Sequence, residues 1–421
     1  MANGVEVAII GAGPYGLSIA SHLRHANIEC RVFGATMGAW KHQMPPGMLL
    51  KSHAWSSSLY DPNAAFTLEA FCAEHSLPYH PADIPVPLET FVAYGEAFQR
   101  RFVPDVENRE LINLSRSGSD FLATFRDGSA VRARKVIVAV GVHPFAHIPP
   151  QLRHLPNELL SHSGEYGPLD RLQGKQVIVL GAGASASGLA ALISEQGIEV
   201  SIVARDNELP FPKLPRTARS LLRRLALPLR PLIHPNSGIG GTWLLKICAD
   251  MPQIIHALPE AYRLHIARTA LGPSGHSSLR SRVIGKIPAH LGRTLSSAEA
   301  EGGRVRLNLA LPDGGSESLV ADHLIAATGF RTDLSRVRFL QTLLPNIRTV
   351  QGSPILSFRY ESSVPGLYFA GPATANSFGP VARFAYGAIH PARTITAHIV
   401  RARSRQGEAL PLTAHAEPTE N

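Results

Sequence analysis

The same local pattern occurs twice in this chain, and it constrains the fold more than any other feature. Residues 7–23 are VAIIGAGPYGLSIASHL and residues 177–193 are VIVLGAGASASGLAALI. In each, β-branched and apolar residues predict a buried strand, a glycine-rich turn follows, and the apolar spacing after the turn predicts a helix. A repeated strand–turn–helix unit predicts an α/β fold with two Rossmann-like, dinucleotide-binding domains.

The first turn has the spacing G-x-G-x-x-G. Gly11 permits the tight turn, Gly13 lets backbone amides approach a pyrophosphate, and Gly16 lets the helix pack closely on the strand. The helix N-terminus adds free amide donors and partial positive charge. We therefore expect this turn, including Pro14, to bind the pyrophosphate of a dinucleotide.

The second turn contains Gly181, Gly183 and Ser185, with an alanine in place of the third glycine. The contact between helix and strand tolerates that alanine. The next strand ends at Arg205 and Asp206. An arginine there suits the 2′-phosphate of NADP, whereas the aspartate favours the free ribose of NAD, and a surface role for Arg205 is the alternative. We expect NADPH.

Two dinucleotide units in one chain indicate one resident and one exchanging nucleotide. We expect FAD in the first and NADPH, which delivers hydride to it, in the second. The strand at residues 30–33 is followed by Gly34, where an acidic residue commonly binds the ribose. Backbone groups or residues 37–40 are expected to replace it; Trp40 either stacks on a cofactor ring or simply packs.

Similar strands predict how the chain is divided. VRARKVIVAVG (131–141) and HLIAATG (323–329) both end in glycine, and GLYFAG (366–371) is a further buried strand. The expected partition inserts the NADP-binding domain into the FAD-binding domain. The FAD-binding domain takes residues 1–148 and 318–401, and the NADP-binding domain takes 149–317 with an unmatched, substrate-shaping region at 206–317. We expect residues 402–421 to form a disordered tail.

Composition narrows the class of protein. The chain has 421 residues, 44% hydrophobic and 17% charged, which is typical of a globular protein with more than one domain. No apolar run reaches the roughly 18 residues that span a bilayer. The N-terminus lacks the basic and apolar regions of a signal peptide. We expect a cytoplasmic protein.

Cysteine spacing and charge exclude further classes. Cys30, Cys72 and Cys248 are far apart and form no C-x-x-C, so we expect neither a metal site nor a redox-active dithiol. The formal charge is +9, and residues 213–234 are basic with no acid. That segment is either an amphipathic surface for a membrane or an acidic partner, or a solvated segment near a dinucleotide site. Its prolines favour the second, and we expect no nucleic-acid partner.

Several motifs together resemble class B flavin-dependent monooxygenases, the group of flavin-containing monooxygenases and lysine/ornithine N-hydroxylases. These are GAGPYG, SHSGEY followed by GKQVIVLGAGASA, AATGF, and GLYFAG followed by GP. The resemblance covers most of residues 5–205 and 320–400. The linker fingerprint of the family is degenerate here: His162, Ser163 and Tyr166 are kept, but the leading Phe and Gly are absent.

The resemblance implies a reaction and a set of site residues. In this family NADPH reduces FAD, oxygen forms a C4a-hydroperoxyflavin, and one oxygen atom passes to a small-molecule substrate. N- or S-hydroxylation is favoured over Baeyer–Villiger chemistry. Lys51 and His53 are the implied catalytic candidates, with a structural basic loop as the alternative, and His162 and Ser163 are expected to join the linker to the nicotinamide site. Further cofactor contacts are implied for Ser52, Thr328, Gly329, Gly371, and, at the start of a helix, Ser377 and Phe378.

Two other functions share the same folds. A flavoprotein reductase passes electrons to a protein or quinone, and the absence of C-x-x-C argues only against its disulfide-reducing branch. The other alternative is a non-enzymatic flavoprotein that senses redox state or binds a partner. Two intact glycine turns argue against it, because a sensor does not need two dinucleotide sites.

Overall fold

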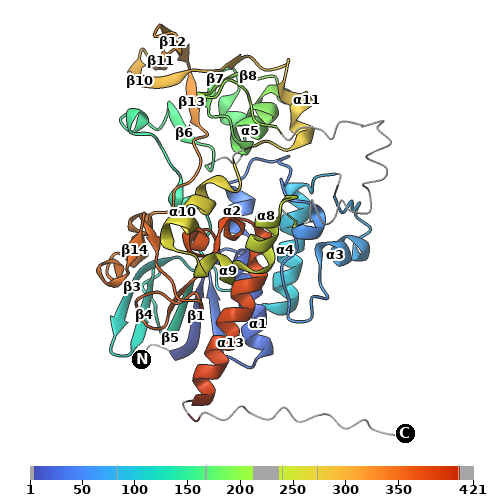
Figure 1. Ribbon diagram of the computed structural model, residues 1–421, viewed down its shortest axis with the longest axis vertical. Coiled ribbons are helices and arrows are strands. Elements are labelled where there is room, and N and C mark those ends of the chain that lie inside the picture. Colours follow the sequence, from blue (N-terminus) through green and yellow to red (C-terminus); the bar gives the residue numbers. More distant parts are fainter. Residues whose placement is uncertain are drawn as a thin grey trace.

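The computed structural model describes residues 4–82, 84–165, 168–211, 237–238, 240–272, 274–405 and 407. The chain forms two α/β domains, one above the other in Figure 1. Both contain parallel strands, with a helix directly after a glycine turn. The predicted α/β fold with two Rossmann-like domains is therefore confirmed.

The sheet of the first domain is mixed. β1 (Gly4–Ile10) pairs in parallel with β2 (Cys30–Phe33) on one side and β5 (Ala130–Val138) on the other. The far edge of β5 pairs first with antiparallel β4 (Asp120–Phe125) and then with parallel β16 (Leu367–Phe369). Antiparallel β3 (Leu111–Ser117) completes the sheet. The two halves of the sequence thus meet at β5.

Helices cover this sheet. α1 (Pro14–His25) follows β1, and all its residues from Pro14 to Leu23 are buried. It packs against α4 (Leu88–Phe102) and α13 (Ile389–Arg405), the long helix that leads to the C-terminus in Figure 1. The smaller helices are α2 (Gly38–His42), α3 (Leu68–Glu74) and α12 (Ala375–Phe378). Because α13 continues to Arg405, the tail predicted from residue 402 begins too early, and residues 408–421 lie outside the described part.

The second domain has a parallel sheet in the order β6-β13-β7-β8-β9. An antiparallel three-stranded sheet, β10-β11-β12, extends from it, and α5 (Ala184–Glu195) follows β7. The strands are β6 (Leu160–His162), β7 (Gln176–Leu180), β8 (Glu199–Val203), β9 (Ala289–His290), β10 (Thr294–Glu301), β11 (Arg304–Ala310), β12 (Ser316–Ala321) and β13 (His323–Ala326).

The predicted boundary at residues 317 and 318 is wrong. β12 and β13 belong to the second domain, because β13 pairs with both β6 and β7. The chain returns to the first domain about ten residues later, where Phe330 bridges to Ala146. A two-stranded hairpin then forms from β14 (Thr349–Val350) and β15 (Ser353–Pro354).

The region predicted as one unit at residues 206–317 is divided between the domains. α8 (Trp243–Asp250), α9 (Pro252–Ala257) and α10 (Glu260–Thr269) pack on the first domain. There Cys248, Ala249 and Ile255 form a small core with Val381. α11 (Arg280–Val283) and the strands after it return to the second domain. Within the described residues, no helix has the length and apolar character needed to cross a bilayer.

Candidate dinucleotide and substrate site

The first glycine turn has the geometry that its spacing predicts. Gly11 has φ +117°, and a Cβ on it would lie 2.3 Å from the Ala139 carbonyl oxygen. A Cβ on Gly16 would lie 1.8 Å from the Gly11 oxygen, whereas one on Gly13 meets nothing within 4 Å. The turn is therefore closed against β5 and open at Gly13, on the side that a ligand approaches.

The start of α1 provides donors at that open side. Gly13 is the N-cap, Pro14 occupies the first turn, and the first intrahelical hydrogen bond runs from Leu17 N to the Gly13 oxygen, 3.0 Å. The amides of Tyr15 and Gly16 precede that bond and have no partner within the helix. Free amides at a helix N-terminus fit a pyrophosphate, so the residues present fit FAD.

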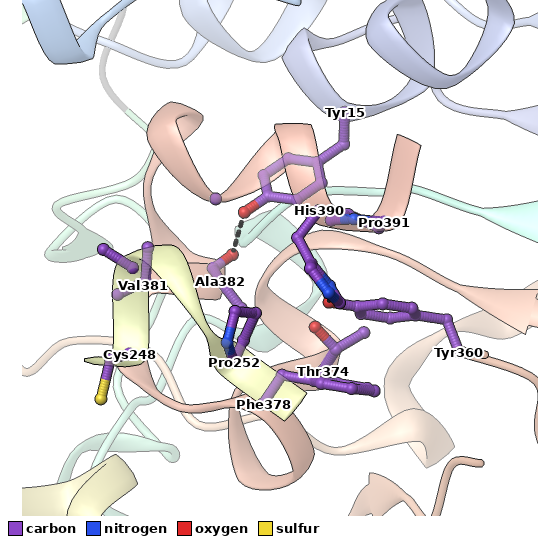
Figure 2. A pocket seen from close by; sticks show the side chains of 12 residues that line it. Tyr15, Cys248, Pro252, Tyr360, Thr374, Phe378, Val381, Ala382, His390 and Pro391 are labelled. Carbon is purple, nitrogen blue, oxygen red and sulfur yellow. Dashed lines mark hydrogen bonds between the residues drawn. The ribbon is translucent and has the colours of Figure 1, made fainter. Parts of the chain in front are cut away.

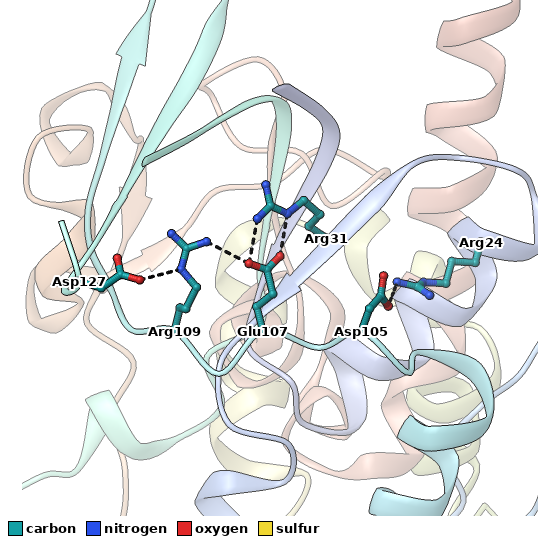
Figure 3. A network of polar contacts seen from close by, with 6 residues as sticks. All are labelled: Arg24, Arg31, Asp105, Glu107, Arg109 and Asp127. Atoms are coloured by element: carbon teal, nitrogen blue, oxygen red, sulfur yellow. Dashed lines mark hydrogen bonds and ion pairs between the residues drawn. The ribbon is translucent and has the colours of Figure 1, made fainter. Parts of the chain in front are cut away.

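Directly after β2 the chain has Gly34, at the position where an acidic residue commonly binds the ribose. Gly34 has φ +126°, and its backbone N–H donates a hydrogen bond to the backbone carbonyl oxygen of Glu107, 2.8 Å. The Glu107 carboxylate is not free to replace the acid, because it binds Arg31 and Arg109 at 2.7 and 2.9 Å (Figure 3). These hydrogen bonds lower the pKa of Glu107, so it stays ionised within the network.

Trp40 has a packing role in the structure. Its indole meets the Phe91 ring edge-on at 4.8 Å and is only partly buried. Nearby, Met37 adopts φ 52° and is fully buried. Stacking of Trp40 on a cofactor ring stays a prediction.

Tyr15 ties the first glycine turn to the C-terminal part of the domain. Its hydroxyl lies 2.9 Å from the carbonyl oxygen of Ala382 (Figure 2) and 2.9 Å from that of Phe384. Its ring lies 3.4 Å from the Cβ position of Gly371, and its hydroxyl lies 2.4 Å from that of Gly387. Residues from the two ends of the chain thus enclose the start of α1. Sequence reasoning missed Tyr15, although its place inside the glycine motif was visible.

The segment with Ser377 and Phe378 differs from the prediction. These residues do not start a helix: they end the one-turn helix α12, and the long helix α13 begins at Ile389. Phe378 stacks on Tyr360 with ring centroids 3.8 Å apart, and the Ser377 oxygen lies 3.3 Å from His256 Nδ1. The cavity beside Phe378 in Figure 2 has a volume of about 10 Å³, room for a water and not for a flavin.

The loop with the predicted catalytic residues lies between the domains. Lys51, Ser52 and His53 are half-buried, and burial lowers the pKa of Lys51. His53 Nδ1 lies 2.7 Å from the Ala82 oxygen. His276, which sequence reasoning missed, approaches this loop from the second domain: its pKa is lowered by burial, then by the charges of His53 and Lys51.

Aromatic side chains adjoin the same loop. Trp55 and Tyr60 both meet Tyr386 edge-on, at 5.7 and 6.4 Å between centroids. Ser56 donates a hydrogen bond to the Gly238 oxygen, 2.8 Å. The loop is therefore walled by the C-terminal segment and by the chain that precedes α8, contacts that join residues far apart in the sequence.

The second glycine turn repeats the first with one change. Gly181 has φ +142°, and a Cβ on it would lie 2.4 Å from the Ala327 oxygen. Gly183 caps α5 and accepts hydrogen bonds from Ser187 N and Oγ, both 3.0 Å. Ala186, in place of the third glycine, is fully buried, whereas Ser185 is exposed. The amides before Ser187 fit the pyrophosphate of a second nucleotide.

Arg205 lies just beyond β8, as predicted. Its side chain is 84% exposed, and among the described residues it forms one ion pair, with Asp206 at 4.0 Å. An exposed guanidinium just beyond β8 fits a 2′-phosphate.

Thr328 and Gly329 lie where the chain crosses between the domains. Thr328 Oγ1 donates to the His147 oxygen, and the Gly329 oxygen accepts from His147 N and lies 2.9 Å from His162 Nε2. Ser163 N donates to the Ala326 oxygen, 3.0 Å. Burial lowers the pKa of His162, which favours neutral imidazole. These hydrogen bonds hold together the two segments that cross between the domains. Tyr166 and the basic segment 213–234 lie outside the described residues.

Comparison with known proteins gives the family. A family model described as pyridine nucleotide-disulphide oxidoreductase matches residues 5–226, more than half of the chain. The chain belongs to the pyridine nucleotide-disulphide oxidoreductase family. It is therefore an oxidoreductase, and the family agrees with the predicted cofactors, a flavin and a pyridine nucleotide.

Similar proteins agree with this assignment. An oxidoreductase described as CzcO-like, from Geobacillus kaustophilus, is 25% identical over 373 residues, which cover 87% of this chain and 90% of that protein. The ornithine N-hydroxylase of Kutzneria sp. 744 superposes with a TM-score of 0.75 at 14% identity, over 95% of this chain and 100% of the other. A bacillithiol disulfide reductase from Staphylococcus aureus has a TM-score of 0.64 at 15% identity, over 95% and 99%. Both structures share the fold.

The cysteines of this oxidoreductase differ from what the family name suggests. Cys30, Cys72 and Cys248 are all free and buried. Burial raises the pKa of Cys248 to about 11, so its thiol stays protonated at neutral pH. Within the described part of the chain, no group of His, Cys, Asp and Glu side chains has the arrangement of a metal site.

Proposed function

We propose that this chain is an FAD- and NADPH-dependent monooxygenase that inserts one oxygen atom from O₂ into a small molecule, by N- or S-hydroxylation. The observation that carries the proposal is the combination of two formed dinucleotide turns with three buried, unpaired thiols. Hydride has a path into a flavin, but no dithiol is present to receive the electrons. The fold shared with the ornithine N-hydroxylase supports this choice.

The proposal assigns roles to the residues described above. The turn formed by Gly11, Gly13, Pro14 and Gly16 binds the FAD pyrophosphate, with the free amides of Tyr15 and Gly16 as donors, and the amides after Gly183 bind that of NADPH. When bound, the flavin supplies the oxygen chemistry through a C4a-hydroperoxyflavin. Lys51 and His53, in the half-buried loop between the domains, donate hydrogen bonds toward the reacting region and help exclude water.

Burial gives Lys51 a specific advantage in this role. Desolvation lowers its pKa, so the group gives up a proton more readily than an exposed lysine. His53 is oriented by its contact with Ala82. His276 brings a third nitrogen-bearing side chain to the loop from the second domain, so the site is complete only when both domains are in place.

A flavoprotein reductase is the second candidate, and the fold shared with a bacillithiol disulfide reductase favours keeping it. In that reaction the flavin passes electrons to a disulfide, protein or quinone. The two functions make opposite demands on the site: a monooxygenase has to protect an oxygen adduct, whereas a reductase has to admit an acceptor.

The test is stopped-flow mixing of the reduced protein, with and without NADP⁺, against oxygenated buffer. A transient absorbance distinct from oxidised and reduced flavin, discharged by a thioether or primary amine, supports the monooxygenase. ¹⁸O₂ label in the product completes the assignment. Direct reoxidation with rapid turnover of an added quinone or disulfide contradicts it and favours the reductase.

The proposal also includes the cellular location of the enzyme and the behaviour of a Lys51 variant. We propose a cytoplasmic enzyme, since NADPH and O₂ are available there. Lys51→Met is expected to leave flavin reduction by NADPH within about twofold and to lower product yield per NADPH, because only the protected oxygen step uses the ammonium. Glu74→Gln on α3, an exposed carboxylate whose ion-pair partner is Arg101 at 3.9 Å, is the matched control and is expected to change neither.

A further inference from the structure

A groove on the surface of the first domain is lined by three arginines. Arg393, Ala397 and Arg401 are spaced four residues apart on α13, so they share one face of the helix. Arg359, from the loop before Tyr360, also lines the groove. The groove has a volume of about 310 Å³, and the small Ala397 side chain leaves room between the two helical arginines.

The groove lies away from both glycine turns. α13 runs beside α1 in the same direction: Gly387, before α13, adjoins Tyr15, and Arg403 near its end donates to the oxygen of Asn27, beyond the end of α1 (Figure 1). Arg393 and Arg401 therefore lie along the middle and far end of α1. The pyrophosphate of a dinucleotide binds at the other end of that helix.

The arginines of the groove are exposed and have no carboxylate partner within the described residues. Figure 3 shows the opposite arrangement in the same domain, where Arg24, Arg31 and Arg109 are each paired with an acid. Unpaired like charges that face one another across a groove repel, which costs stability unless an anion is present.

Helix electrostatics account for only part of the cluster. Arg403 and Arg405 lie in the last turn of α13, where a cation interacts favourably with the helix dipole. Arg393 is the fifth residue of α13, beyond the first turn, so the helix dipole does not favour a cation there. Its position is therefore unexplained by the helix itself.

His398 adds a titratable group to the same groove. Its Nδ1 lies 3.0 Å from the Tyr368 hydroxyl. Burial lowers its pKa, the charge of Glu361 raises it, and the charges of Arg359, Lys135 and Arg405 lower it. Glu361 is otherwise engaged, since its carboxylate accepts a hydrogen bond from Gly366 N, 2.7 Å.

We propose that this groove binds a small phosphate-bearing anion, such as pyrophosphate or the phosphates of a nucleotide, at a site separate from both dinucleotide turns. A guanidinium presents two parallel N–H donors to phosphate oxygens, and three of them surround a volume suited to a di- or triphosphate. Thr394, which also lines the groove, adds a hydroxyl donor. The proposal does not depend on the reaction of the flavin.

The test is calorimetric titration of inorganic pyrophosphate into the full chain, loaded with FAD and saturated with NADP⁺ so that both turns are filled. Saturable binding is expected, weakened roughly tenfold or more in Arg393→Gln/Arg401→Gln, because charge-assisted hydrogen bonds are lost. Arg100→Gln replaces an exposed arginine on α4 that forms no ion pair within the described residues; it is the matched control and is expected to bind as the parent does.

A second measurement reads the groove directly. Bound pyrophosphate is expected to raise the pKa of His398, followed by NMR and assigned with His398→Gln, because the anion offsets the surrounding cations. No saturable binding, equal weakening by Arg100→Gln, or an unmoved His398 titration overturns the proposal.

A separate arm distinguishes the source of the phosphate. Vesicles containing phosphatidylglycerol are mixed with the protein and sedimented, with and without pyrophosphate. Co-sedimentation that pyrophosphate reverses assigns the phosphate to a lipid headgroup, and pyrophosphate binding without co-sedimentation assigns it to a soluble molecule.

Discussion

The two glycine turns of this oxidoreductase share a motif but not an environment. Around the first, every residue of α1 from Pro14 to Leu23 is buried, and Tyr15 ties the turn to Ala382 and Phe384. Around the second, Ser185 is exposed and the residues from Gly181 to Ala184 are half-buried. An enclosed turn suits a nucleotide that stays, and an open one suits a nucleotide that exchanges.

The third position of the motif reflects the same contrast. At Gly16 an added Cβ would lie 1.8 Å from the Gly11 oxygen, so the first turn is closed to any side chain. At the corresponding place the second turn holds Ala186, fully buried, so a methyl group is accommodated there. At the third position of the motif, the first turn therefore has no room for a methyl group, whereas the second turn accommodates one.

Exchanging these two residues tests the contrast most severely. Gly16→Ala is expected to cost at least about 3 kcal/mol of unfolding free energy, because backbone has to move away from the methyl group. Ala186→Gly is expected to cost only about 1 kcal/mol, from helix propensity and lost packing. Chemical denaturation measures both, and equal losses would show that the turns are packed alike.

Gly13 and Gly183 separate the cofactors. Gly13→Val is expected to leave the fold intact, since its Cβ position is open, and to remove most bound FAD by blocking the pyrophosphate. Gly183→Val is expected to keep the flavin and lose reduction by NADPH. Flavin absorbance per chain and the rate of reduction give the two readouts. Full FAD occupancy in Gly13→Val would contradict the assignment of the first turn.

We expect acid pH to destabilise the protein through His390, which lines the same small cavity as Tyr15 of the first turn. His390 lies 2.6 Å from the Tyr360 hydroxyl, and burial lowers its pKa to about 4. Between pH 6.5 and 4 the unfolded chain binds the proton more readily, so stability falls as pH falls, by up to about 3 kcal/mol, and no further below that window.

His390→Gln, which cannot gain the proton, is expected to flatten this part of the pH dependence. Thermal unfolding across the pH range, with the parent chain as reference, measures the difference. An unchanged slope in the variant would assign the acid sensitivity to other groups.

The smallest expected effect concerns nucleotide choice at the open turn. Arg205→Ala is expected to cost about 1–3 kcal/mol of NADPH binding and to leave NADH nearly unchanged, because only NADPH offers a 2′-phosphate. Flavin reduction rates with each nucleotide give the preference. Asp206→Asn is the neighbouring control, and a preference that survives Arg205→Ala would leave Arg205 as a surface residue.

Local pattern was enough to predict the two turns, and not enough to predict their surroundings. Strand, turn and helix follow from the spacing near Gly11 and Gly181, because those interactions span only a few residues. The strand at residues 323–326 was placed in the wrong domain because its glycine ending resembles that of residues 131–141. Its pairing with β7 depends on residues about 145 positions away in the sequence.

The candidate site was predicted less completely for the same reason. Lys51 and His53 were predicted from a resemblance, whereas His276, Tyr386 and the carbonyls that contact Tyr15 join them only through the fold. The helices α8 to α10 carry no motif, so their place on the first domain had no local signal.

The crossovers at His147 and Gly329 bear on how such a chain can be rebuilt. His147 N lies 2.9 Å from the Gly329 oxygen, and Arg331 N lies 2.8 Å from that of Phe145, so the first domain presents two neighbouring ends to everything between them. A segment whose ends meet is a cassette that can be excised or transplanted with a short join. α8 to α10 are encoded within the cassette yet cover Val381 of the host domain. A chimera that imports another nucleotide preference therefore has to retain those helices, or it will uncover apolar surface where they packed.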